Sequence, residues 1–288
     1  MTHKNPVWNS YLNTQRTDQE RVELTSGITN RLLRYGIDEK QGYELEVRIL
    51  DKLFEGLPIN EEIRRGFEAL KIFIPRVPAE ILNRYDTVKY EISSLHLDNL
   101  IIGACGLSPL GKVIAIKKPT INIWDTDLID IVSYRNAQNK DKLKNYHIKE
   151  WDLLSELQPS FLNEIHRGKT AIVVEGLTFY LDNHQMKQFH RNIQKFAIKV
   201  GAEQPAKIIM DYYIADIPAR QRDIVVNPQH PEWESFKKLI SNVHDSQRSF
   251  WKSRKEVKKY LRSLGYKNIR VSPISTVDNA HTVFVFEY

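Results

Sequence analysis

In the first third of the chain, apolar residues recur at steps of three and four positions, as Ile49 and Leu53 do. This spacing is typical of helices that bury one face. Breaks at Gly36 and Pro58 mark helix ends. We therefore predict two or three helices between residues 15 and 73, and a further helix over residues 79–94.

From about residue 95 onward the pattern changes to short apolar runs, most of them separated by helical stretches. Strands that alternate with helices predict a parallel sheet covered on both faces. The last run, Val283-Phe284-Val285-Phe286, follows a loop rather than a helix, so we expect it to pair antiparallel. The predicted strands cover residues 97–102, 120–124, 146–151, 170–174, 207–210, 269–271 and 282–287.

These patterns predict an α/β protein with a seven-stranded, mostly parallel sheet and an antiparallel C-terminal strand. We assign residues 1–94 to a helical N-terminal cap and residues 95–288 to the core domain. A polar insertion over residues 211–245 separates the fifth and sixth strands. It is either a lid that faces the substrate or a surface excursion, with a helix predicted over residues 232–244.

Composition limits the classes of protein. Of the 288 residues, 41% are hydrophobic and 27% are charged, and no apolar run is long enough for a membrane span. The N-terminal residues lack the pattern of a leader peptide, so we expect a cytoplasmic protein. Cys105 is the one cysteine, which excludes an internal disulfide and a multi-cysteine zinc site, and we predict no metal.

The net charge of +6 supports only weak attraction to anions. Cations and aromatic residues alternate over residues 248–262, a pattern that would also suit RNA. The apolar positions Val257, Leu261 and Leu264 form one helical stripe, so we predict a solvated helix and no nucleic-acid partner.

The richest segment joins the first predicted strand to a turn that contains Gly103 and Gly106. Glycine lets the backbone approach a ligand closely, and Asp125 ends the next strand about 20 residues later. Such an acid can accept the two hydroxyl hydrogens of a ribose. An ordinary tight turn, with Asp125 as a cap, is the alternative, and we expect Asp127 to cap the following helix.

Glu175 follows the apolar run Ala171-Ile172-Val173-Val174 directly. A carboxylate at the edge of a buried sheet needs a cation or several hydrogen-bond donors, because an unpaired buried charge is costly. The cation is either part of a ligand or an arginine or lysine of the chain itself.

Three segments in fixed order, residues 103–111, 124–128 and 173–181, resemble the leucine carboxyl methyltransferase family of class I S-adenosylmethionine-dependent enzymes, which includes bacterial members linked to polyketide synthesis. The resemblance covers roughly residues 95–185 and implies a Rossmann-like fold with S-adenosylmethionine as cofactor. The chain departs from the family at Ser108, where many members have an acid, at Leu110, where bacterial members often have arginine, and at Asp125, where glutamate is usual.

The resemblance also implies roles for single residues. It places Asp125 at the ribose, Asp152 near the adenine amino group and Glu175 at the α-ammonium of the cofactor. An N-cap for the next helix is the alternative role for Asp152. From their positions in the chain we also predict that Tyr180, Asp211 and Tyr212 line the acceptor pocket, with a place in the core as the alternative for Tyr180. The full set predicted to bind cofactor is Gly103, Ala104, Gly106, Ser108, Asp125, Asp152, Glu175 and Gly176.

The implied reaction is methyl transfer to a carboxylate or hydroxyl of a small molecule or a chain terminus. Positioning supplies most of the acceleration in such an in-line displacement, and a carboxylate acceptor needs no base, so we assign no catalytic residue. Two alternatives stay open. One is a non-catalytic relative that acts as a binding module. The other is a nicotinamide-dependent oxidoreductase, which the absence of Gly-x-Gly-x-x-Gly disfavours.

Overall fold

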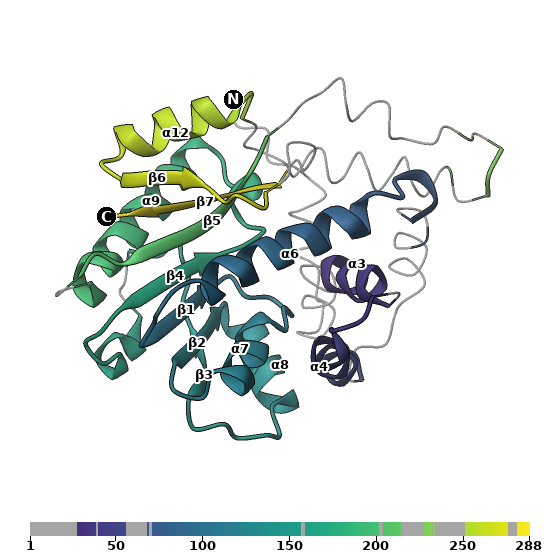
Figure 1. The fold of residues 1–288 in the computed structure, drawn as a ribbon, viewed down its shortest axis with the longest axis horizontal. Coiled ribbons are helices and arrows are strands. Elements are labelled where there is room, and N and C mark those ends of the chain that lie inside the picture. The colour runs from purple at the N-terminus through teal and green to yellow at the C-terminus, as the bar shows by residue number, and fades with distance from the viewer. Residues whose placement is uncertain are drawn as a thin grey trace.

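The computed structural model describes residues 28–38, 40–55, 68, 71–156, 159–201, 204–214, 227, 229–231, 233, 251–275 and 281–288. Within them, seven strands form a sheet in the order β3-β2-β1-β4-β5-β7-β6 (Figure 1). The strands are β1 (Asn99–Gly103), β2 (Asn122–Asp127), β3 (Tyr146–Glu150), β4 (Thr170–Val174), β5 (Lys207–Tyr213), β6 (Lys267–Val271) and β7 (His281–Glu287).

Strands β1 to β5 pair in parallel, whereas β7 runs antiparallel between β5 and β6. A parallel pair needs a long crossover connection, which a helix supplies. The link from β6 to β7 is shorter than the roughly twelve residues that such a crossover needs, and these two strands form an antiparallel pair. The predicted Rossmann-like sheet with its reversed C-terminal strand is confirmed.

The two faces of the sheet bury separate hydrophobic clusters, because neighbouring residues of a strand point to opposite sides. Ile102 belongs to the cluster under α6, α7 and α8, together with side chains of α3 and α4. Ile101 belongs to the cluster under α9 and α12. The helices are α3 (Ile28–Ile37), α4 (Glu44–Phe54), α6 (Val77–Ser93), α7 (Leu110–Lys117), α8 (Ile129–Gln138), α9 (Asn183–Val200) and α12 (Arg254–Ser263).

The long helix α6 crosses the sheet near β5 and β7 (Figure 1) and buries Leu82, Tyr85 and Val88 in the same cluster as strand residues. The predicted helical character of the N-terminal segment is therefore observed where it is described. The domain boundary at residue 95 stays a prediction. Most of the proposed insertion over residues 211–245, and with it the helix predicted for residues 232–244, lies outside the described residues.

Helix α12 agrees with the interpretation of the basic segment as a solvated helix. Val257 and Leu261 are fully buried, and the Oγ atom of Ser253 caps the helix by accepting from the N–H of Glu256.

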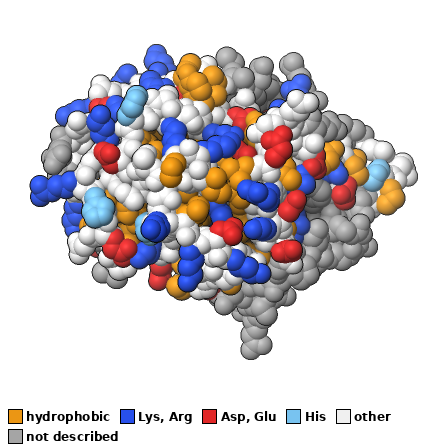
Figure 2. All heavy atoms as spheres, turned by 60° about the horizontal axis from the view of Figure 1, so that its bottom comes forward, with side chains coloured by type: hydrophobic (Ala, Val, Ile, Leu, Met, Phe, Trp, Pro, Cys, Tyr) orange, Lys and Arg blue, Asp and Glu red, His pale blue; other side chains and the backbone are white. Residues whose placement is uncertain are grey.

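Lysine and arginine side chains on the face shown in Figure 2 are mixed with acidic ones. Among the described helices, none combines the length and apolar character that crossing a bilayer requires.

Gly111 tests how tightly α7 packs on the sheet. A Cβ atom at this position would overlap the Oδ1 atom of Asp125. An alanine in a helix normally stabilises it relative to glycine, but overpacking a core costs about 1–3 kcal/mol. We expect Gly111→Ala to lower the free energy of unfolding by about that amount in urea denaturation. Ser133→Ala, on an exposed position of α8, is the control and should change it by less than about 0.5 kcal/mol.

Candidate functional site

The loops after β1, β2 and β4 meet at the carboxyl edge of the sheet, where open α/β sheets bind ligands. The loop after β1 turns through Ala104 and Gly106, whose φ angles are 51° and 50°. Its Gly106 N–H donates to Oδ2 of Asp127 over 2.7 Å, and the other oxygen of Asp127 accepts from the N–H of Leu128 over 2.8 Å. Asp127 therefore ties the β1 loop to the end of β2.

Arg135, on α8, holds this loop in place through hydrogen bonds to its backbone. Its guanidinium donates to the backbone carbonyls of Gly106 over 2.7 Å and Ser108 over 3.0 Å, and also to Oη of Tyr146 over 2.7 Å. It forms a buried ion pair with Asp125. Arg135 could not be predicted from the sequence, because a single arginine in a predicted helix belongs to no motif.

The structure corrects the role predicted for Asp125. This side chain is completely buried, and its Oδ2 accepts from Arg135 and, over 2.6 Å, from Tyr146. Burial raises the pKa of Asp125, and its two partners only partly offset that effect. Its oxygens thus face the interior beneath α7, while Asp127, two residues later, reaches the edge.

Glu175 forms a salt bridge with Arg84 of α6, with 2.8 Å between Oε1 and Nε. Of the two kinds of cation considered for Glu175, the chain itself supplies one, the guanidinium of Arg84, while the predicted role of Glu175 at the α-ammonium of the cofactor stays a prediction. Burial raises the pKa of Glu175, and Arg84 opposes this shift. Arg84 could not be predicted as a partner from the sequence, because it lies in the N-terminal helical part and precedes Glu175 by 91 positions.

Asp211, at the end of β5, shares Arg84 with Glu175 at a distance of 3.8 Å. It also accepts from the N–H of Gly176 over 2.7 Å and from Nδ1 of His281 over 2.9 Å. Burial alone would raise its pKa, but His281 and Arg84 outweigh this and hold the pKa of Asp211 below its ordinary value. Asp211 is 1% exposed, so it supports the β4 loop rather than opening onto a pocket as predicted.

The other predicted residues lie in four environments. The Oγ of Ser108 accepts from the N–H of Leu110 at the start of α7. Asp152 is exposed, and its Oδ1 accepts from the N–H of Leu154. Gly176 has a φ of 74°, and Tyr180 lies half-buried in the same loop. Gly103 is buried at the end of β1.

Tyr212 does not belong to the site. It is fully buried on the α9 side of the sheet, and its hydroxyl lies 2.9 Å from Nε2 of His190. The Nδ1 atom of His190 lies 3.0 Å from the hydroxyl of Tyr266. The prediction that Tyr212 lines an acceptor pocket was wrong, because alternation along β5 turns it away from Asp211.

His190 makes stability depend on pH. Burial lowers its pKa from 6.5 to about 3, so below pH 6.5 the unfolded chain binds a proton that the folded chain rejects. The free energy of unfolding should therefore fall by about 2 kcal/mol for this group between pH 7 and pH 5. Urea denaturation at both values should show a correspondingly smaller drop for His190→Gln than for the unaltered protein. If the free energy of unfolding falls equally in both proteins between pH 7 and pH 5, the pH dependence does not come from His190.

Comparisons with known proteins agree with this fold. No protein-family model and no curated protein matches the chain. A structure of a proposed methyltransferase from Thermobifida fusca YX superposes with a TM-score of 0.55 and 12% identity, over 88% of this chain and 97% of that chain. The S-adenosylmethionine-dependent methyltransferase SibL gives 0.50 and 12%, over 98% and 77%. The methyltransferase domain of bacterial CtHen1 gives 0.50 and 15%, over 71% and 96%. At these identities the likeness is one of fold.

Proposed function

We propose that this protein is an S-adenosylmethionine-dependent O-methyltransferase. The observation that carries the proposal is the sheet order, in which β7 runs antiparallel between β5 and β6. Superposable structures described as methyltransferases support it, as does the sequence resemblance to the leucine carboxyl methyltransferase family. The insertion of the reversed β7 between β5 and β6 disfavours the alternative of a nicotinamide-dependent oxidoreductase, whose doubly wound sheet has the strand order 3-2-1-4-5-6.

The charges at the end of β4 suit the amino acid head of this cofactor, which carries an ammonium and a carboxylate. Glu175 and Asp211 are two carboxylates that share the single guanidinium of Arg84, so the group has a net charge of −1 when His281 is neutral. An additional ammonium would balance that charge. Arg84 also approaches Gly176, with Nη2 3.3 Å from where a Cβ would lie, and can there meet a carboxylate.

The end of β2 suits the nucleoside part. Asp127, rather than Asp125, has carboxylate oxygens at the carboxyl edge, where ribose hydroxyls can donate to them. Leu128 and Ile129 follow it and are 54% and 51% exposed, which provides an apolar surface beside the carboxylate for a base. Asp152, exposed at the end of β3, stays our candidate for the adenine amino group.

We propose a carboxylate or hydroxyl of a small molecule or chain terminus as the methyl acceptor. The cofactor supplies an activated methyl group, and the chain has only to align the acceptor oxygen with it. A carboxylate is already ionised at neutral pH, so transfer to it needs no general base. Tyr180, which lies half-buried in the loop after β4, is the described residue that we propose to contact the acceptor.

Calorimetry with S-adenosylhomocysteine tests cofactor binding. We expect saturable binding to the unaltered protein. Asp127→Asn and Glu175→Gln should each weaken it by roughly tenfold or more, since hydrogen bonds to charged groups contribute about 1.5–3 kcal/mol. Glu164→Gln, which removes an exposed carboxylate paired with Lys149, is the matched control and should bind normally.

Absence of binding to the unaltered protein would refute the proposal. Binding without transfer of a labelled methyl group from S-adenosylmethionine to any component of a small-molecule or peptide extract would instead favour the non-catalytic relative. Circular dichroism of each variant separates lost binding from lost folding.

A further inference from the structure

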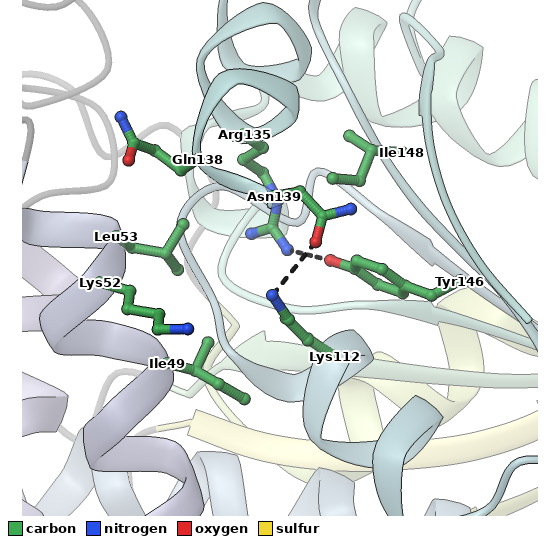
Figure 3. Close-up of a pocket in the computed structure, with 9 residues that line it drawn as sticks. All are labelled: Ile49, Lys52, Leu53, Lys112, Arg135, Gln138, Asn139, Tyr146 and Ile148. Carbon is green, nitrogen blue, oxygen red and sulfur yellow. Dashed lines mark hydrogen bonds between the residues drawn. The ribbon is translucent and has the colours of Figure 1, made fainter. Parts of the chain in front are cut away.

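A pocket lies between α4, α7, α8 and β3, on a helix-covered face of the sheet rather than among the loops at its carboxyl edge (Figure 3). It contains about 330 Å³ of space outside the protein atoms, part of it open to solvent. Lys52 extends into it from α4, Lys112 from α7 and Arg135 from α8. The site proposed above uses none of these three cations directly.

Little negative charge lies near the two lysines of the pocket. Lys112 is only 9% exposed and donates to Oδ1 of Asn139 over 3.1 Å. Its ion pair is with Asp141 at 3.4 Å, and Lys52 uses the same oxygen at the same distance. The side chain of Asp141 is 57% exposed. One carboxylate at the rim thus serves two ammonium groups.

Arg135 contributes an unused donor. Its terminal nitrogens are engaged by Asp125, Tyr146 and the carbonyls of the β1 loop. Its Nε atom is buried and has no hydrogen-bond acceptor among the described residues. Leaving a buried N–H unpaired is costly, and native proteins usually satisfy such a group with water or a ligand.

We propose that this pocket binds a small oxyanion, a phosphate or a carboxylate. Its oxygens would accept from Nε of Arg135 and from Nζ of Lys112, with Lys52 balancing the remaining charge. Guanidinium and ammonium groups are the preferred partners of such oxygens. Three cations line the pocket, and their acidic partners are the two residues Asp125 and Asp141. One added negative charge therefore neutralises the group.

Binding here would affect the loop after β1 through a single side chain. Arg135 holds the carbonyls of Gly106 and Ser108, and an anion on its remaining N–H would restrict the guanidinium further. The anion site itself does not depend on the proposed methyltransferase activity, so its test uses no cofactor.

The test is thermal unfolding of the full chain in increasing inorganic phosphate or acetate, with sodium chloride added to keep the ionic strength constant. A ligand of the folded state raises the melting temperature in a saturable way. We expect phosphate, acetate or both to do so, and the stronger of the two identifies the class of oxyanion. Lys112→Gln should weaken the apparent affinity by about tenfold or more.

The matched control is Lys117→Gln, which removes the same charge from the same helix at a position that does not line the pocket. It should respond like the unaltered protein. The proposal is overturned if neither phosphate nor acetate raises the melting temperature more than chloride does. It is also overturned if Lys112→Gln and Lys117→Gln respond alike. Should Lys112→Gln fail to fold, Lys52→Gln, at a half-exposed position, decides the question, because it too must weaken the response.

Discussion

The guanidinium of Arg84 joins α6 to the ends of β4 and β5, two strands that also pair with each other through their backbones. It projects from α6 and balances Glu175 after β4 and Asp211 at the end of β5. Removing one partner of such a buried pair typically costs about 3–5 kcal/mol, because the other charge is left uncompensated. For this reason, helix α6 contributes a charged group to the carboxyl edge of the sheet in addition to covering one of its faces.

Arg135 performs the equivalent task in the other half of the sheet, at β1, β2 and β3. It connects α8, β2 and β3 and holds the backbone of the β1 loop from beneath. Both arginines are thus buried and support the loops at the carboxyl edge of the sheet from the protein interior. Side chains and backbone at a binding edge are most effective when neighbouring groups lock them in place before the ligand arrives, and these two cations supply that support.

The strands could be predicted from the sequence because their signal is local. Each apolar run, such as residues 170–174, predicts its own strand, and the loop before Val283 predicts the reversal of β7. The site was harder, because its partners are distant in sequence. Asp125 and Asp127 are two positions apart on β2 and point to the same face of the sheet, but Asp125 is buried there whereas Asp127 lies at the end of the strand. Nothing near Glu175 in the sequence indicates that an arginine of α6 will pair with it.

Arg84 and Glu175 are separated by 91 positions, and this distance has a consequence for folding. An ion pair that spans so much chain forms only after the intervening strands have been ordered, and contacts of this range slow folding. Until then α6 must keep its guanidinium in water. The carboxyl edge of the sheet and the hydrophobic core are therefore completed together, so a chain with a half-formed core also lacks the ion pairs of this edge.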